Sequence, residues 1–352
     1  PWQALVEKYP ASAYRAKALY WVGKVADLAA GEPAGGEFWD RLIAINPHDY
    51  YALRAAQVRS GEALNSTRLV VAPVDVPPWD RAQAEREILS WLRTWTTVPT
   101  DTQSLALPRV LATRSDVERG EALLAVGLRR QALAAFGDTL GGVWNQPLNL
   151  ARIAVYFRDR GLYGLAARAA ARLASLWPHG NLYATPLPLQ HLAYPLAYTD
   201  LLSEEAVAYE LDPLLLAALI RQESLFEKEA ESWAGARGLG QVMPATGEGI
   251  ARTLKMDGFV LDDLYHPWVS IRFGAFYLSV QLDRFDDQLL VGLAAYNGGP
   301  GNTLRWIEMT GEDDFDLDLF VEVITAGQSR IYLQTVYAQY LRYEALYRSG
   351  AR

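Results

Sequence analysis

Residues 211–226 read LDPLLLAALIRQESLF, and this stretch decides the class of fold that we expect. Asp212 followed by Pro213 is a strong helix start, because an aspartate can accept the first free backbone N–H groups and proline suits the first helical position. The residues that follow are almost all apolar, as in a helix that is buried in a core. We therefore predict a buried helix that carries Glu223 near its end.

Glu223 is an unusual residue for such a helix. The side chains three, four and seven positions before it are apolar and share its helical face. A carboxylate on an apolar face loses hydration, which raises its pKa and suits a general acid near neutral pH. Two structural roles would explain the same glutamate: an ion pair with Arg221 or Arg237, or a helix end that reaches the surface.

Two glycine-rich motifs follow this helix. Residues 235–247 read GARGLGQVMPATG, and residues 289–301 read LLVGLAAYNGGPG. Glycines at this density allow a backbone to turn sharply or to approach a ligand closely, although neither motif is a phosphate-binding loop. Alone, the second motif would be an ordinary helix C-terminus. Together with Glu223, the amide of the first motif and the Tyr-Asn pair of the second indicate polar groups that converge on a cleft.

The composition excludes several classes of function. The chain has 352 residues, 51% of them hydrophobic and 21% charged, which is typical of globular domains with large cores. A net charge of -8 argues against nucleic-acid binding. With no cysteine and four scattered histidines, we expect no metal site and no cofactor. No apolar run is long enough to span a membrane, and we expect any signal peptide to have been removed before Pro1.

The first half of the chain consists of expected helix pairs. The stretch GLRRQALAAF from Gly127 resembles GLYGLAARAA from Gly161, and their separation of 34 residues is the period of a tetratricopeptide-type hairpin. We predict an α-superhelix of stacked hairpins over residues 1–176. Prolines and glycines then cluster, so we predict a linker at 177–198 and a second α-helical domain at 199–352.

A family resemblance rests on four motifs in order: RQESLF at 221–226, GARGLGQVMPATG, YHPWVSIRFGAFYL at 265–278 and AAYNGGPG at 294–301. Together they resemble the catalytic domain of soluble lytic transglycosylases, from about Tyr194 to Leu346. The resemblance implies a goose-type lysozyme-like fold that cleaves peptidoglycan. The first half, more loosely, is similar to that family's α-superhelical domain.

Carried over residue by residue, the resemblance makes Glu223 the catalytic acid/base and gives Tyr296 a hydrogen bond toward it. The residues implied to bind substrate are Ser232, Gln241, Met243, Tyr296, Asn297, Arg330 and Tyr332. The chain departs from the family pattern at Gly240, where Met is frequent, and at Ser270, where Asn is usual. The amino acids at 325–330 also differ from the family pattern. We expect all these changes to lie on the walls of the substrate-binding subsites.

The implied reaction needs one carboxyl group. It would protonate the oxygen between N-acetylmuramic acid and N-acetylglucosamine, and then accept a proton from the C6 hydroxyl as a 1,6-anhydro ring closes. The substrate's own N-acetyl group would assist at C1. We expect the nearby Glu227, Glu229 and Glu231, and the acidic stretch 312–318, to be solvated charges.

Two alternatives stay open: a hydrolytic muramidase on the same fold, and a scaffold that binds glycan without cleaving it. Peptidoglycan strands are the expected partner, with other cell-wall enzymes as further candidates. Such a substrate implies an extracytoplasmic location, in the periplasm or cell envelope.

Overall fold

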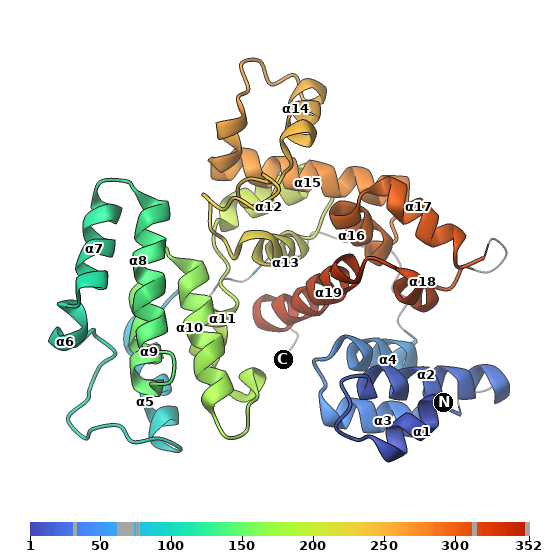
Figure 1. The fold of residues 1–352 in the computed structure, drawn as a ribbon, viewed down its shortest axis with the longest axis horizontal. Coiled ribbons are helices and arrows are strands. Elements are labelled where there is room, and N and C mark those ends of the chain that lie inside the picture. Colours follow the sequence, from blue (N-terminus) through green and yellow to red (C-terminus); the bar gives the residue numbers. More distant parts are fainter. Residues whose placement is uncertain (31–33, 62–73, 75, 77, 312–314, 349–352) are drawn as a thin grey trace. The chain divides into compact units, whose positions relative to one another are not determined.

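The computed structural model describes residues 1–352 except 31–33, 62–73, 75, 77, 312–314 and 349–352. The described residues form helices joined by turns and loops, with isolated β-bridges but no β-strand among them (Figure 1). The prediction of an all-α fold is therefore confirmed. The chain divides into two compact units, each of which is described by itself.

The first unit contains Pro1–Val70 and Tyr277–Arg342. Its helices are α1 (Trp2–Lys8), α2 (Arg15–Ala30), α3 (Gly36–Ile45), α4 (Tyr50–Ser60), the end of α15 (Pro267–Arg284), α16 (Leu289–Gly298), α17 (Pro300–Glu308), α18 (Leu317–Val323) and most of α19 (Gly327–Tyr347). In its core the Trp39 Nε1 donates to the Tyr20 carbonyl oxygen at 3.1 Å. Gly23 makes room for the indole, because a Cβ there would lie 2.3 Å from that nitrogen.

The second unit contains Val71–Phe276 and Tyr343–Arg352. Its helices are α5 (Arg81–Arg93), α6 (Arg109–Ala112), α7 (Ser115–Ala125), α8 (Arg129–Gly142), α9 (Pro147–Arg158), α10 (Tyr163–Leu176), η1 (Leu182–Ala184), α11 (Leu187–Ala193), α12 (Thr199–Ala208), α13 (Pro213–Ser224), α14 (Pro244–Thr253), η2 (Leu261–Tyr265), the start of α15 and the end of α19. The short elements η1 and α11 lie in the predicted linker at 177–198. The predicted domain boundaries stay a prediction.

Two helical hairpins of the second unit, α7–α8 and α9–α10, have the same turn. In each, a glycine with positive φ (78° at Gly127 and 66° at Gly161) stands two residues before the second helix. The residue after each glycine donates its backbone N–H five residues back, Leu128 to Leu123 and Leu162 to Phe157, both at 2.9 Å. This is the hydrogen-bond pattern of a Schellman motif. The resemblance between the two stretches therefore reflects a shared local structure.

The predicted helix start at Asp212 and Pro213 is confirmed. The Asp212 carboxylate accepts the Leu214 N–H at 2.8 Å, and Pro213 is the first residue of α13. Asp212 is also ion-paired with Arg348, near the end of the chain. With only 1% of Asp212 exposed, this cap fixes the start of α13 inside the core of the second unit.

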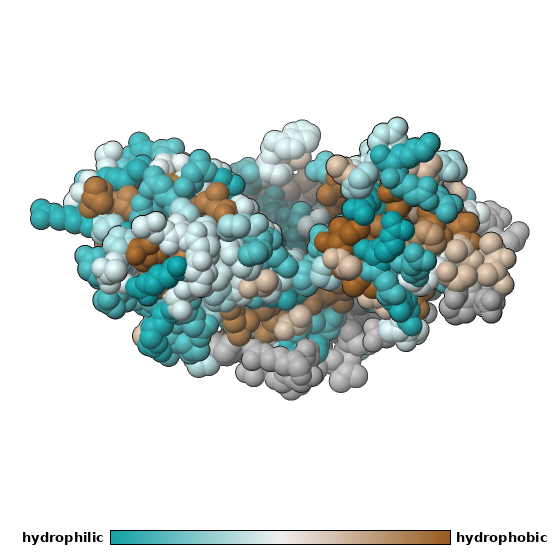
Figure 2. Space-filling view, turned by 90° about the horizontal axis from the view of Figure 1, so that it is seen from below, coloured by the Kyte–Doolittle hydropathy of each residue, from teal (hydrophilic) through white to brown (hydrophobic). Residues whose placement is uncertain are grey.

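On the face drawn in Figure 2, apolar residues of the described part of the chain form brown patches among hydrophilic ones. Among the described residues, no helix is both long enough and apolar enough to cross a membrane. The large apolar side chains exposed in the second unit include Trp233, which is 99% exposed, and Met243, which is 43% exposed.

Candidate active site

Glu223 lies in the last turn of α13, where the helix leaves the core. Residues 213–220 are all buried, whereas Arg221, Gln222, Glu223 and Ser224 are half-buried. The helix thus has the predicted apolar face, but its end reaches the surface, which was one of the structural roles considered for Glu223. Such a position lets the carboxyl group contact a ligand while its backbone stays anchored in the core.

The two arginines considered as structural partners of Glu223 have other contacts. The Arg221 guanidinium donates to the Ala193 carbonyl oxygen through Nε at 3.1 Å and Nη2 at 3.0 Å, and it lies 4.2 Å from the centre of the Tyr194 ring. Arg237 is paired with Asp262 at 2.9 Å. Each arginine therefore has a structural role of its own.

The backbone directly after α13 is held in an uncommon conformation. Leu225 and Phe226 have φ angles of 50° and 60°, in the left-handed region that bulky residues rarely occupy. Phe226 is 1% exposed, so its burial helps to keep the turn in place. Gly164 of α10 packs against this turn, since a Cβ there would lie 3.2 Å from the Leu225 carbonyl oxygen. Strain of this kind persists only where the surroundings enforce it.

Glu227, one residue further, forms an ion pair that sequence reasoning missed. It pairs with Arg129 through Nε–Oε1 at 2.8 Å and Nη2–Oε2 at 3.0 Å, and the two side chains are only 13% and 14% exposed. Burial opposes the charge on Arg129, but the hydrogen bond and charge of Glu227 outweigh it and raise the pKa of Arg129. The expectation that Glu227 is a solvated loop charge is wrong, because its partner comes from the distant helix α8.

Glu231 is exposed, as expected for a solvated loop charge, but it also has two partners. Its carboxylate accepts from Arg130 at 2.8 Å and from the Tyr265 hydroxyl at 3.0 Å. Hydrogen bonds from Tyr265 and Arg130 lower the pKa of Glu231. Nothing in the amino-acid pattern of this loop indicated either partner.

The base of the glycine-rich loop is closely packed. Gly238 has φ of 75°, and a Cβ there would lie 1.9 Å from the Leu264 carbonyl oxygen. The Gly240 N–H donates to the Ser270 Oγ at 3.1 Å, and Ser270 is fully buried. The two departures from the family pattern at Gly240 and Ser270 therefore contact each other, where α15 meets the base of the loop. The expectation that they line subsite walls is wrong, because both residues are buried.

Polar groups of the loop first stabilise the loop itself. The Gln241 Nε2 donates to the carbonyl oxygens of Ala230 at 3.2 Å and Gly238 at 3.0 Å. The Ser232 Oγ accepts the Ala236 N–H at 3.0 Å. Since both amide hydrogens of Gln241 are used, its Oε1 is the atom with which it can bind a ligand. Met243 is exposed and stands at the N-cap of α14.

The Tyr-Asn motif ends α16 in the first unit. Tyr296 is half-buried, and its ring meets the edge of the Tyr277 ring with centroids 5.3 Å apart. The exposed Asn297 accepts a hydrogen bond from the buried Ser329 through Oδ1 at 2.9 Å. Gly298 allows this approach, because a Cβ there would lie 3.2 Å from the Ser329 Oγ and 2.7 Å from the Trp306 ring. The motif thus has tertiary contacts beyond those of an ordinary helix end.

Arg330 and Tyr332 lie on α19, also in the first unit. Arg330 is half-buried and donates to the Glu322 carbonyl oxygen at 3.3 Å. Tyr332 is 5% exposed, so it can contact a ligand only through a small part of its side chain. The structure thus brings Glu223, Ser232, Gln241 and Met243 into the second unit, and the four other predicted site residues into the first.

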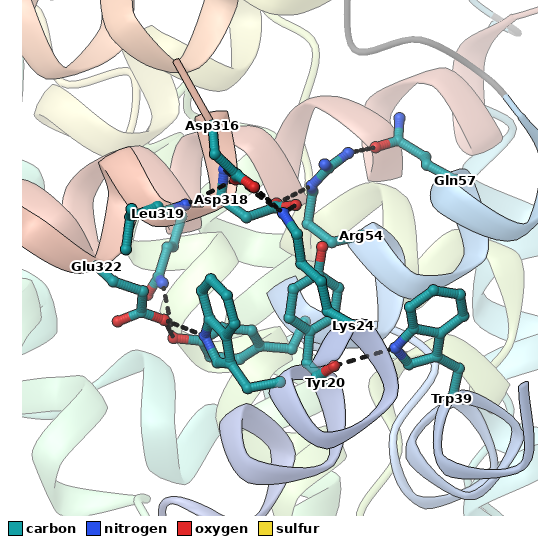
Figure 3. A network of polar contacts seen from close by, with 12 residues as sticks. Tyr20, Lys24, Trp39, Arg54, Gln57, Asp316, Asp318, Leu319 and Glu322 are labelled. Atoms are coloured by element: carbon teal, nitrogen blue, oxygen red, sulfur yellow. Dashed lines mark hydrogen bonds and ion pairs between the residues drawn. The ribbon is translucent and has the colours of Figure 1, made fainter. Parts of the chain in front are cut away.

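The acidic stretch 312–318 is only partly described, because residues 312–314 lie outside the described residues. The expectation of a solvated loop is wrong for its end. Asp316 caps α18, and the buried Asp318 accepts from Arg54 Nε at 2.9 Å and Lys24 Nζ at 2.6 Å (Figure 3). Glu322 continues the network, accepting from Trp21 Nε1 at 3.0 Å and the Tyr51 hydroxyl at 2.7 Å.

Comparison with known families places the candidate acid in a recognised domain. Residues 200–319 match the family model described as transglycosylase SLT domain. The chain is related to the soluble lytic transglycosylases. The match includes α13, the glycine-rich loop and the Tyr-Asn motif, which are the segments on which the resemblance was first based.

Curated relatives and solved structures agree with this relationship. The soluble lytic murein transglycosylase of Escherichia coli K12 is 32% identical over 156 residues, which cover 44% of this chain and 23% of that protein. The transglycosylase of Enterobacteria phage PRD1 is 33% identical over 111 residues, covering 32% of this chain and 38% of that protein. The chain thus aligns with well under half the length of these relatives.

The fold is similar to that of solved lytic transglycosylases. The 70 kDa soluble enzyme from Escherichia coli gives a TM-score of 0.71 at 22% identity, covering 99% of this chain and 50% of that one. A Pseudomonas aeruginosa lytic transglycosylase, solved as an inactive glutamate-to-glutamine mutant, gives 0.68 at 21% identity, covering 100% and 51%. The predicted fold class, with its lysozyme-like part, is therefore confirmed.

Proposed function

We propose that this chain is a peptidoglycan lytic transglycosylase. It cleaves the β-1,4 bond between N-acetylmuramic acid and N-acetylglucosamine without water and leaves 1,6-anhydro-N-acetylmuramic acid ends. The observation that supports this most strongly is a glutamate at the surface end of an otherwise buried helix, followed in the chain by a glycine-rich loop, inside the segment that matches the transglycosylase model. Substrate and activity are transferred here from relatives that the chain matches only in part.

Glu223 acts as the single acid and base of the reaction. Its protonated carboxyl group donates a proton to the glycosidic oxygen as the bond to C1 breaks, and the N-acetyl group of the substrate stabilises C1. The carboxylate then accepts the proton of the C6 hydroxyl while that oxygen bonds to C1. The proton count balances, and Glu223 returns to its starting state without a water molecule.

The substrate-binding groups are Ser232, Gln241, Met243, Tyr296, Asn297, Arg330 and Tyr332. Gln241 contributes through Oε1, because its nitrogen holds the loop. The family resemblance assigns to the Tyr296 hydroxyl a hydrogen bond toward Glu223. Asn297, already bound to Ser329 through Oδ1, offers its amide nitrogen to the glycan.

Domain organisation and location follow from the same proposal. Residues 1–176 form a helical-repeat domain, 177–198 connect it, and 199–352 form the catalytic domain. Because intact peptidoglycan lies outside the cytoplasmic membrane, the enzyme works in the periplasm or cell envelope. Other cell-wall enzymes are candidate partners there.

A Glu223→Gln variant tests the assignment. The amide keeps the volume of the side chain but cannot donate the proton, so cleavage should fall by about 10²–10⁴-fold or more. Binding should persist, and bulgecin A, which a related 70 kDa soluble lytic transglycosylase binds, is a suitable probe for it. Glu248→Gln, an exposed carboxylate of α14 in the same domain, is the control and should keep full activity. Near-native turnover by Glu223→Gln would refute the role of Glu223.

Product mass separates this function from its two alternatives. Purified cell walls digested with the full chain should release disaccharides that are lighter by one water than reducing-end products. Reducing ends would identify a hydrolytic muramidase. Binding to cell walls with no release of sugar by the wild-type chain would identify a glycan-binding scaffold.

A further inference from the structure

Arg129, in the proposed helical-repeat segment of residues 1–176, contacts the loop that follows Glu223. Arg129 is the first residue of α8, and its guanidinium forms two parallel hydrogen bonds with the carboxylate of Glu227, at 2.8 and 3.0 Å. The same Nη2 donates to the Gly161 carbonyl oxygen at 3.0 Å, in the turn between α9 and α10. One side chain thereby joins two helical hairpins to the loop that follows α13.

Glu227 in turn holds the turn that ends α13. Its N–H donates to the Ser224 carbonyl oxygen at 3.0 Å, and its Oε1 also accepts the Glu229 N–H at 3.2 Å. Between Ser224 and Glu227 lie the two left-handed residues, whose backbone conformation is unfavourable without support. An anchored Glu227 therefore opposes relaxation of this turn.

The ion pair between Arg129 and Glu227 has the properties of a strong contact. A two-bond arginine–carboxylate pair fixes orientation as well as distance, and exclusion of water strengthens it. Its side chains are 13% and 14% exposed. The neighbouring pair Arg130–Glu231 joins the same helix to the same loop, but its side chains are 46% and 37% exposed. Exposed pairs of that kind contribute little.

We propose that Arg129 is a positioning residue for the catalytic acid. By holding Glu227, it fixes the left-handed turn, and with it the last turn of α13 and the direction of the Glu223 side chain. The inference rests on the proposed function of Glu223. It gives the helical-repeat segment an indirect part in the chemistry, through the position of Glu223, because a displacement of about 1 Å at a reacting group can lower a rate by about 10²-fold.

The test compares Arg129→Ala, Arg129→Lys and Arg130→Ala in the full chain. We expect Arg129→Ala to lower kcat for soluble glycan fragments by about 10-fold, with KM changed by less than about two-fold. Arg129→Lys should keep part of the rate, and millimolar guanidinium ion should restore part of it to Arg129→Ala. Arg130→Ala removes the same charge from the same helix turn and should act like the wild type.

Hydrogen exchange gives a second measurement that does not depend on activity. Amides of residues 224–230 should exchange faster in Arg129→Ala than in Arg130→Ala, because Arg129 holds Glu227 directly after the turn, whereas Arg130 contacts the loop further on, at the Glu229 carbonyl oxygen and the Glu231 carboxylate. If Arg129→Ala fails to fold, Glu227→Gln gives the same test from the other side of the pair.

Different results would refute the positioning role of Arg129 and the proposed function of the chain. An unchanged kcat per folded molecule with a lowered Tm would make Arg129 merely structural, and so would equal effects of Arg129→Ala and Arg130→Ala. Unchanged exchange at 224–230 would also refute the positioning role. By contrast, a wild-type chain that releases no anhydro product would refute the proposed function, while the exchange measurement would still decide whether Arg129 holds the turn.

Discussion

Removing the Asp318 carboxylate should destabilise the first unit strongly. Asp318 is 7% exposed and accepts from Arg54 Nε at 2.9 Å and from Lys24 Nζ at 2.6 Å. In Asp318→Ala the Arg54 guanidinium, itself 8% exposed, would stay buried without its countercharge. Breaking a buried pair on one side costs about 3–5 kcal/mol. Arg54 keeps a bond to Gln57 at 3.0 Å and Lys24 keeps Asp316, so we expect about 3 kcal/mol.

Urea denaturation measures how much stability Asp318→Ala loses. An ion pair on the surface provides the control. Arg119 and Asp138 are also 3.0 Å apart, but their side chains are 60% and 69% exposed, so Asp138→Ala should cost about 1 kcal/mol or less. Hydrogen exchange of α18 amides should also report the loss locally, because amide exchange measures opening segment by segment. If Asp318→Ala and Asp138→Ala have the same effect on stability, the reasoning from burial is wrong.

The ion pairs of Asp318 with Arg54 and Lys24 should make the stability of the first unit sensitive to acid. Burial raises the pKa of Asp318, but the charges of Arg54 and Lys24 and their hydrogen bonds outweigh it and lower the pKa below its usual range. A carboxyl group with a lowered folded-state pKa stabilises the fold fully above its unfolded pKa of about 3.9, and the contribution disappears as the pH falls through the folded-state value. The stability difference between wild type and Asp318→Asn should therefore shrink below about pH 4. A difference that grows on acidification would contradict this sign.

Four further variants test single contacts. Gly238→Ala should lower the free energy of unfolding by about 4 kcal/mol or more, since its Cβ would lie 1.9 Å from the Leu264 carbonyl oxygen; an unchanged Tm would refute this. Trp233→Ala should change stability by about 0.5 kcal/mol or less in urea denaturation, because Trp233 is 99% exposed. Tyr296→Phe should lower turnover strongly and leave the Tm nearly unchanged, and the reverse pattern would make the hydroxyl structural. Asp212→Ala should cost at least about 1 kcal/mol in urea denaturation, through loss of the α13 cap.

Features encoded by neighbouring residues were predictable from the sequence. The start of α13 follows from Asp212 and Pro213, whose effects on a helix are local. The matching turns at Gly127 and Gly161 follow from glycine's access to positive φ. In both cases the deciding contacts are between residues a few positions apart, so a window of sequence contains all the necessary information.

Contacts between distant residues were not predictable. Glu227 and Asp318 each read as a solvated acid, because they stand among other charges in a polar segment. Their arginine partners are 98 and 264 positions away, and no local pattern links them. The contact between Gly240 and Ser270 was hidden for the same reason, although both positions were noticed as departures from the family pattern.

These distant contacts lead to a last prediction, for the isolated segment of residues 200–352. As a predicted catalytic domain, it could be expected to cleave short soluble glycans by itself. The structure gives two reasons to expect a weaker and less stable enzyme. Asp318 and Glu322 would lose all the partners that α2 and α4 provide, and the turn after Glu223 would lose Arg129.

Thermal unfolding and turnover on soluble fragments test this prediction on one sample. We expect a lower Tm than that of the full chain, together with a kcat reduced at least as much as in the full-length Arg129→Ala variant. Starting the segment at residue 79, which restores Arg129 but not α2 or α4, should recover kcat more than Tm. The reason is that the acid's turn depends on α8, whereas the buried acids of α18 depend on the first helices. A 200–352 segment as stable and as active as the full chain would show that neither set of contacts matters for the catalytic domain.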